Sequence, residues 1–319
     1  MAQPLSPSDH RTCVDIRDQR EFAEHGDDPD ACLHIVAGHY DVITGAAPID
    51  SILASVRVES VLGNAVIGSV RGSASIKMVA GTAKIGCVCD GTGIGHVRDR
   101  ATVGCVRDSG RVGLLTDDAR IGSMEDWSTV GSADSRAVMG TVRDFATVGD
   151  LRGEAAIRHV TGAATVGRVG GRAVIGLLVG SATVQRVEDA ARVTAAGTTS
   201  VHAYGGVVRA APRVAVFRHS ATAVITGGVV VDVSQATTDL AHWAVQAGVE
   251  VRGDTLLVYR SADDNDGDRF TNHPLAGPTG PAAGPQLACA VPLGAASIVD
   301  EQTVAARAFR VLHSVDESR

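Results

Sequence analysis

Four aspartates recur at a fixed spacing in the middle of the chain. Asp90, Asp108, Asp126 and Asp144 lie eighteen residues apart, so a chain that coils every eighteen residues would stack them at about 4.8 Å, the spacing of adjacent strands. Stacked carboxylates could bind Ca²⁺, as they do in nonapeptide β-rolls. Those rolls also carry a paired-glycine loop, which this repeat lacks, and an arginine directly precedes two of the four aspartates. We therefore expect the aspartates to form turns and no metal site, with calcium as the alternative.

The cysteines offer a second kind of chemistry. Cys87 and Cys105 are also eighteen residues apart and would be stacked neighbours, close enough for a disulfide if oxidised. The chain opens without a basic segment followed by an apolar run, so we expect a cytoplasmic protein with reduced thiols. Zinc is a further alternative for Cys87, Cys89, Cys105 and His96, although their spacing matches no standard zinc motif. His202, His219, His242 and His313 are scattered, and we expect them at the surface or in turns.

These residues sit in a repeat that is the strongest signal in the sequence. An aliphatic residue recurs every nine positions from Ile67 to Val193, through fifteen consecutive repeats without an insertion. A second apolar or small residue follows three positions later, and alanine stands two positions before in twelve of the fifteen repeats. Glycine or aspartate comes five positions after the aliphatic residue in thirteen of them. The consensus is A-x-[VI]-G-x-V-x-[DG]-x.

This pattern predicts short strands separated by tight corners. Residues two apart point to the same face of a strand, and Gly and Asp tolerate the left-handed conformation that corners need. Such units stack into a parallel β-solenoid. Thr129, Thr147, Thr165 and Thr183 mark an eighteen-residue super-period, which favours two repeats per coil, while a three-sided coil remains an alternative. A threonine column would also suit an ice-binding surface, but such surfaces usually carry doubled threonine arrays, and this repeat supplies one threonine per coil.

Composition narrows the class of protein. The 319 residues are 45% hydrophobic but only 3% aromatic, which excludes intrinsic disorder and indicates a narrow interior of small aliphatic side chains. No apolar stretch is long enough to span a membrane. The net charge is −7, yet residues 47–198 carry 17 basic and 15 acidic residues. We expect no nucleic-acid partner and no membrane partner, and a DNA-mimic inhibitor, which needs an acidic rod, is only an alternative.

Three domains are predicted. Residues 1–46 form an N-terminal cap with a short helix or charged segment, residues 47–233 the solenoid, and residues 234–319 a small α+β domain with a Pro/Gly-rich loop at 264–286. In the last domain we expect a helix over 237–248 and a hairpin with an RGD turn over 249–260. Strands are expected at LACAVPL and AARAFRVLHSVD.

The segments SVHAYGG, TGGVVVDV, HWAVQAGVEVRGDTLLVYRSADD and AFRVLHSVD resemble a group of uncharacterised actinobacterial and actinophage proteins. In that group an Ala/Val/Gly-rich β-solenoid precedes a small C-terminal domain. The domain is faintly similar to ADP-ribosyltransferase-like folds, in which an Arg or His on the first strand helps to bind NAD, and Arg260 is the matching residue. The Gly-Gly-Gly-Leu-His-Phe-Ser type segment expected after that strand is missing from residues 264–286.

No GxSxG, P-loop, HExxH or Rossmann fingerprint occurs in the chain. We therefore expect a non-enzymatic scaffold or interaction module with no cofactor, which binds a protein partner or self-associates through the solenoid ends. The alternatives are an effector with a degenerate ADP-ribosyltransferase-like domain, for which the solenoid is a spacer, and the DNA-mimic inhibitor.

Overall fold

A computed structural model describes residues 13–233 and the segments 249–252, 255–261, 269–271, 286–292, 296–298, 303–306 and 310–315. The chain divides into two compact units, Met1–Val231 and Asp232–Arg319. The predicted boundary after residue 233 lies two residues from this division.

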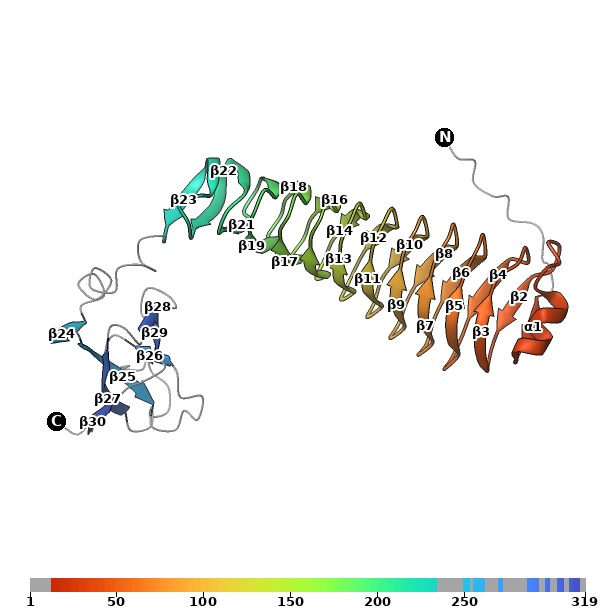
Figure 1. Cartoon of the computed structure of the whole chain (residues 1–319), viewed down its shortest axis with the longest axis horizontal. Helices are drawn as coiled ribbons and strands as arrows, with labels where there is room; N and C mark the ends of the chain where they lie inside the picture. Colours follow the sequence, from red (N-terminus) through yellow and green to blue (C-terminus); the bar gives the residue numbers. More distant parts are fainter. Residues whose placement is uncertain are drawn as a thin grey trace. The chain divides into compact units, whose positions relative to one another are not determined.

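The first unit is a parallel β-solenoid of about 12 turns (Figure 1). Two strands make one turn, because each strand pairs in parallel with the strand two places along the chain. Thus β10 (Thr102–Val106) pairs with β8 (Lys84–Val88) and β12 (Arg120–Met124). Paired residues are eighteen apart, as for Val103, which lies opposite Ile85 and Ile121. The prediction of an all-β solenoid with two nonapeptides per turn is confirmed, and the three-sided coil is wrong.

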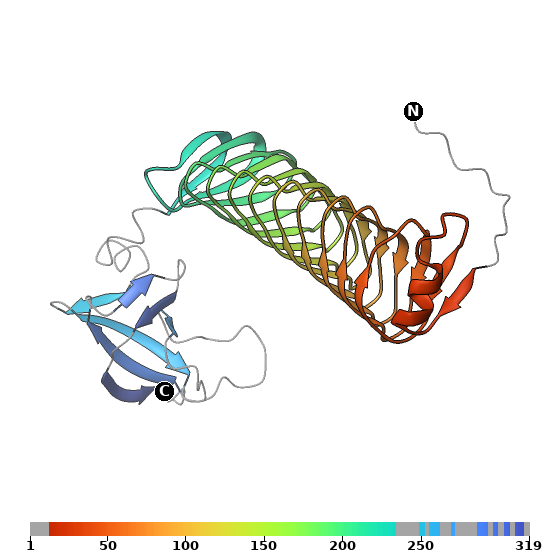
Figure 2. The ribbon, with the colours of Figure 1, turned by 45° about the vertical axis from the view of Figure 1, so that its right-hand side comes forward.

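The other strands of this unit stack along the solenoid in the same way, from one end to the other (Figure 2). They are β1 (Val14–Ile16), β2 (Leu33–Ile35), β3 (His39–Ile43), β4 (Ile49–Ile52), β5 (Arg57–Val61), β6 (Val66–Val70), β7 (Ser75–Val79), β9 (Gly93–Val97), β11 (Arg111–Leu115), β13 (Thr129–Ala133), β14 (Val138–Val142), β15 (Thr147–Leu151), β16 (Ala156–Val160), β17 (Thr165–Val169), β18 (Val174–Leu178), β19 (Thr183–Val187), β20 (Arg192–Ala195), β21 (Ser200–Ala203), β22 (Val207–Arg218) and β23 (Val224–Asp232).

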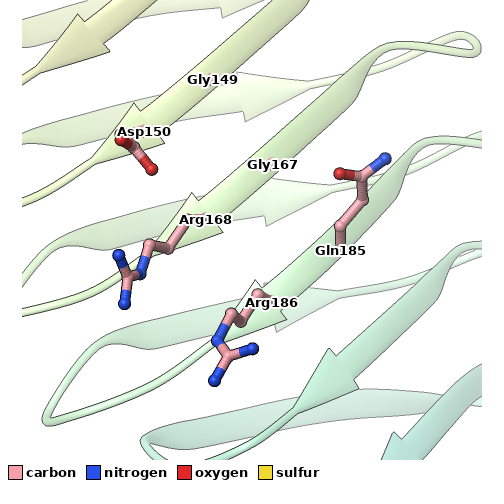
Figure 3. Close-up of a pocket in the computed structure, with 6 residues that line it drawn as sticks. All are labelled: Gly149, Asp150, Gly167, Arg168, Gln185 and Arg186. Carbon is pink, nitrogen blue, oxygen red and sulfur yellow. The ribbon is translucent and has the colours of Figure 1, made fainter. Parts of the chain in front are cut away.

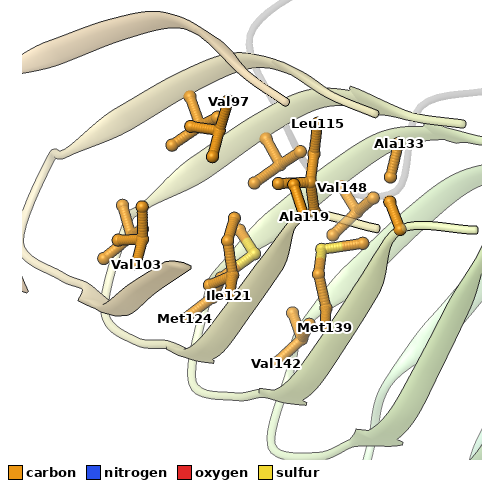
Figure 4. Close-up of a cluster of buried hydrophobic side chains, with 14 of the residues drawn as sticks. Val97, Val103, Leu115, Ala119, Ile121, Met124, Ala133, Met139, Val142 and Val148 are labelled. Atoms are coloured by element: carbon orange, nitrogen blue, oxygen red, sulfur yellow. The ribbon is translucent and has the colours of Figure 1, made fainter. Parts of the chain in front are cut away.

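Most of the nonapeptides bury three side chains. In the repeat around β12 these are Ala119, Ile121 and Met124, none more than 2% exposed. Figure 4 shows such residues meeting between the two faces of the coil. The space between two strands of one turn admits Ala, Val, Ile, Leu and Met, which accounts for the low aromatic content. Two repeats place a hydroxyl where alanine usually stands, at Thr92 and Ser128, both fully buried.

The corners take the left-handed conformation that the sequence predicts. Asp90, Asp99, Asp108, Asp117, Asp126, Asp144 and Asp189 have φ between 55° and 61°, and glycine fills most of the remaining corners. Ser135 takes the same conformation, with φ of 61°, in a repeat that lacks Gly and Asp there. In the last nonapeptide the left-handed residue is Gly197 (φ 77°), one position early, because the period shortens from nine to eight between Val193 and Val201.

The solenoid begins earlier than the predicted boundary at residue 47. Strands β1, β2 and β4 already pair in parallel in the first turns. The helix α1 (Gln19–His25) stands at this end of the stack (Figure 2), where its Phe22 joins the core and meets the Tyr40 ring edge-on with centroids 6.3 Å apart. Asp18 caps the helix by accepting hydrogen bonds from the Arg20 and Glu21 amides. The predicted cap is therefore this single short helix together with the first turns.

The described strands of the second unit form an antiparallel sheet. They are β24 (Glu250–Arg252), β25 (Thr255–Ser261), β26 (Arg269–Thr271), β27 (Gln286–Pro292), β28 (Ala296–Ile298), β29 (Thr303–Ala306) and β30 (Arg310–Val315). The predicted hairpin is present as β24 paired with β25, and β27, β29 and β30 occupy the other predicted strand segments. Strand β26 falls inside the segment predicted to be a loop. The helix expected over 237–248 lies outside the described residues.

Candidate functional site on the solenoid surface

The stacked aspartates connect neighbouring turns. The Asp90 Oδ2 accepts a hydrogen bond from the Gly72 amide at 2.8 Å, and the Asp126 Oδ2 accepts one from the Asp108 amide at 3.2 Å. Asp108 accepts in the same way from the Asp90 amide at 3.4 Å. These bonds give the carboxylates the role at the corners that the sequence predicts, while calcium binding by Asp90, Asp108, Asp126 and Asp144 stays the alternative. Within the described part of the chain, only Cys13, Cys32 and His34 bring three potential metal ligands within 4.8 Å of one another.

The expectation of reduced thiols differs from the structure, which contains two disulfides. Cys87 and Cys105 are bonded because the parallel register sets them directly opposite each other. Cys13 and Cys32 are bonded at the first turn, a pairing that the sequence did not predict. The zinc alternative gains nothing from His96, whose Nε2 lies 2.8 Å from the Thr116 hydroxyl.

A shallow pocket of about 460 Å³ lies on one face of the solenoid (Figure 3). Gly149 and Gly167 line it from β15 and β17, and Asp150, Arg168, Gln185 and Arg186 supply its polar groups. A side chain at Gly167 would place its Cβ only 2.6 Å from the Gly149 carbonyl oxygen, so glycine allows the strands to approach here. Figure 3 shows Arg168 and Arg186 projecting side by side from neighbouring strands.

The two arginines of this pocket share one acid. Glu188 accepts hydrogen bonds from the Nε of Arg168 and, at 2.8 Å, from the Nε of Arg186. The hydrogen bond from Arg168 is the main reason that the pKa of Glu188 is lowered, and burial opposes it. The charges at this pocket therefore compensate one another, since Asp150 also pairs with Arg152.

A column of stacked rings continues the same face beyond the pocket. The Arg186 guanidinium lies 4.1 Å above the Tyr204 ring, and Tyr204 stacks on His219 with centroids 4.2 Å apart. His219 in turn stacks on His202, which stacks on Phe217. The Nδ1 of His202 and the Nε2 of His219 lie 3.0 Å apart. Burial lowers the pKa of both histidines, and for His219 the neighbouring His202 and Arg186 add to this effect.

Two strongly exposed aromatic side chains form a pair on a corner of the solenoid. Trp127 is 66% exposed and Phe145 52%. Their rings stack with centroids 4.6 Å apart and planes only 9° apart. They occupy equivalent corner positions eighteen residues apart, where other turns of the same column carry Ser109, Ala163 and Ser181. Nothing in the described structure covers the pair.

Arg260, the predicted NAD-binding residue, lies in β25, where its backbone is paired with Leu287 of β27. The segment that would complete such a site, 264–286, lies mostly outside the described residues. NAD binding therefore stays a prediction.

The class that this geometry defines is a parallel β-solenoid of two-stranded turns, with an ordered polar surface and exposed aromatic residues. No protein-family model, curated protein or solved structure matches the chain. No helix in the described part of the chain has the length and hydrophobicity of a membrane span.

The sequence contained a signal for most of these surface groups. An eighteen-residue comparison links Trp127 to Phe145 and Cys89 to Arg107 as directly as it links the aspartates. The ring column could not be found in this way, because Val201, Val208 and Val216 break the nine-residue period that would have aligned its members.

Proposed function

We propose that this protein is a non-enzymatic scaffold that binds a protein partner through the lateral surface of its solenoid. The observation that supports this most directly is the exposed Trp127–Phe145 stack. Interface hot spots are enriched in Trp and other large aromatic residues, and a chain with only 3% aromatic residues places two of them together in solvent. Charged side chains adjoin the pair, with Asp126 before Trp127 and Asp144, which lies 3.7 Å from Arg143, before Phe145, so we expect a partner whose apolar pocket has a polar rim.

The rest of the described surface is consistent with a scaffold. The regular hydrogen-bonded turns hold surface groups at a constant spacing, and rigid placement lowers the entropic cost of binding. The ion pairs along the corners, such as Arg136 with Asp118 at 2.8 Å and Arg143 with Glu125 at 2.8 Å, neutralise one another. This pattern supports neither a DNA mimic nor a nucleic-acid-binding surface.

Self-association through the ends is the second candidate. The last strand of the solenoid, β23, exposes Val224 and Val229, each 56% exposed, and Val230, and apolar strands at the end of a sheet can pair with another chain. The opposite end counts against endless stacking, because α1 and the three-residue β1 stand there. A closed dimer through β23 fits these two ends better than a filament.

Replacing Trp127 by Ser and Phe145 by Ala tests the proposal. Both replacements are the residues that neighbouring turns carry at this position, so the fold should be kept. Val66→Thr, at a 46% exposed valine of β6, is the matched control for loss of exposed apolar surface. We expect a partner cross-linked from native cells by the wild-type and the V66T chains to be lost from the double variant.

Light scattering after size exclusion, over a range of concentrations, separates the two candidates. A mass that stays at the 32.7 kDa monomer excludes self-association. A dimer that persists in the W127S/F145A chain assigns assembly to another surface. A cross-linked partner that the double variant retains would overturn the role of the aromatic pair.

A further inference from the structure

Three cysteines and one arginine meet at a corner that the proposed function does not use. Cys87, in β8, is bonded to Cys105, in β10. The third cysteine, Cys89, is a free thiol that is only 2% exposed, and its Sγ lies 3.2 Å from the Cys87 Sγ. On its other side the Arg107 Nε donates a hydrogen bond to the Cys89 Sγ at 3.3 Å. A free thiol is thus in contact with one sulfur of a disulfide.

The next turns provide an internal comparison for this arrangement. Glu125 stands two turns after Cys89 in the same column, and Arg143 stands one turn after Glu125, as Arg107 does after Cys89. Arg143 donates to Glu125 at 2.8 Å, and Ser123 donates to Glu125 at 2.9 Å. Cys89 therefore occupies the position that the Glu125 carboxylate occupies two turns later. Arg107 and Cys87 contact Cys89 there, as Arg143 and Ser123 contact Glu125.

One side of the Cys89 sulfur contacts a cationic hydrogen-bond donor, and the other side contacts a disulfide sulfur. The nucleophile in disulfide exchange is a thiolate. The hydrogen bond with Cys89 is also the main reason that the pKa of Arg107 is raised. The equivalent bond with Glu125 raises the pKa of Arg143.

We propose that Cys87, Cys89 and Cys105 form a thiol–disulfide exchange site that reacts with low-molecular-weight disulfides. The Cys89 thiol gives its proton to solvent and its sulfur attacks the Cys87 Sγ. A Cys87–Cys89 bond forms as the Cys87–Cys105 bond breaks, and the Cys105 sulfur leaves with the electron pair. One disulfide and one sulfur at the thiol level exist before and after this step, so it needs no oxidant.

The exchange moves the reactive sulfur from the interior to the surface. Cys89 is buried, whereas Cys105 is half-buried on the outer side of β10. The Cys105 thiolate can then attack one sulfur of an external disulfide, which forms a mixed disulfide and releases the other half as a thiolate. The exchange would thus convert a buried thiol, Cys89, into a disulfide and leave an accessible thiol, Cys105.

Peptide mapping of the oxidised, folded, full-length chain tests this directly. Trypsin cleaves after Lys84, Arg98, Arg100 and Arg107, so residues 85–98 carry Cys87 and Cys89 and residues 101–107 carry Cys105. Before exchange the two peptides are cross-linked. After iodoacetamide is added under native conditions, we expect peptide 101–107 to be released with an alkylated Cys105, and peptide 85–98 to carry an internal disulfide. The same chain incubated with oxidised glutathione should carry glutathione on Cys105.

Three variants complete the experiment. Cys89→Ser should keep the peptides cross-linked and unlabelled, because the internal nucleophile is gone. Arg107→Gln should slow alkylation of Cys105 several-fold, and Arg107→Lys should restore part of the rate. Arg143→Gln removes the equivalent arginine beside Glu125 and should leave the rate unchanged.

The proposal fails if the wild-type peptides remain cross-linked over times in which the urea-unfolded chain is fully alkylated. It also fails if Cys105 of the C89S variant is alkylated as fast as that of the wild type, or if oxidation leaves all three sulfurs as thiols. Circular dichroism of each variant shows whether it is folded, and R107K is informative where R107Q is not folded.

Discussion

At the scale of single residues, the alanine of the nonapeptide shows how little space the interior of the coil leaves for side chains. It is fully or almost fully buried in nearly every described turn that carries it. Thr92, which replaces it in one repeat, satisfies its hydroxyl by donating to the Cys89 carbonyl oxygen at 2.7 Å. Ser128 replaces it in another repeat, but its Oγ is buried without a hydrogen-bond partner. The same repeat position thus holds one satisfied and one unsatisfied polar group.

Ser128→Ala should therefore stabilise the protein. It restores the residue found one turn later at Ala146 and removes a buried hydroxyl with no partner, whose desolvation costs about 1–3 kcal/mol. We expect the midpoint of urea unfolding to rise. Thr92→Ala is the matched control, and it should lower the midpoint or leave it unchanged, because a satisfied hydrogen bond is lost. An equal rise in both variants would show that alanine propensity, not hydrogen bonding, decides the effect.

At the scale of elements, each pair of stacked strands repeats the same contacts, so a pair that departs from the repeat is easily recognised. The ring column that joins β19, β21 and β22 is the largest departure from the repeat. Its two histidines face each other at 3.0 Å, which requires one ring nitrogen to donate and the other to accept. Protonation of the accepting nitrogen removes this hydrogen bond, and a charge on His219 is opposed by Arg186 and by burial.

This geometry predicts that the C-terminal turns lose stability in mild acid. The pKa values of His202 and His219 are lowered below 6.5 in the fold, so the unfolded chain binds protons first as the pH falls through that value. Stability is then unaffected by the pair above about pH 7 and decreases as the pH drops below 6.5. The thermal midpoint should fall more between pH 7.5 and 5.5 for the wild type than for a His202→Asn/His219→Gln chain. Equal falls would contradict this role.

The environment of Tyr40 predicts a loss of stability at high pH. Its ring is buried beneath α1, and its hydroxyl donates to the Ala37 carbonyl oxygen at 2.8 Å. Burial, with smaller contributions from Asp18 and Glu21, raises its pKa from 10.0 to about 12. Between these values the unfolded chain releases a proton that the folded chain keeps, so stability should fall as the pH rises above 10. Absorbance at 295 nm should show one tyrosine of the wild type, absent in Tyr40→Phe, that ionises late.

For the whole molecule, the sequence predicted the solenoid well because a single periodic rule determines it. The nine-residue spacing specified the inward residues, the corner residues and the two strands per turn. It failed where the rule is broken: the eight-residue step before Val201 placed Tyr204, His202 and His219 together, and no periodicity connects Cys13 with Cys32. Groups that act across turns could be found only by comparing residues eighteen apart, and this comparison works only within the regular array.

The same rule predicts that whole turns can be removed. Deleting residues 146–163 takes out β15 and β16 and joins Phe145 to Ala164, so that β17 would pair with β13 and β18 with β14. The first new pair sets Val166 opposite Val130, and the second sets Ile175 opposite Met139. Both inward columns therefore stay apolar. Because turns of a solenoid contact mainly their neighbours, we expect a folded protein whose solenoid is shorter by about 4.8 Å.

Circular dichroism and small-angle scattering of this chain would measure both expectations. The matched control deletes only Thr147 and Val148, which removes an inward valine and leaves seven residues for half a turn, fewer than any described repeat between Ile67 and Val201. This short deletion should unfold or strongly destabilise the solenoid, although it removes nine times fewer residues. If the eighteen-residue deletion were the more damaging of the two, stability would depend on contacts beyond neighbouring turns, and the additive description of this solenoid would be wrong.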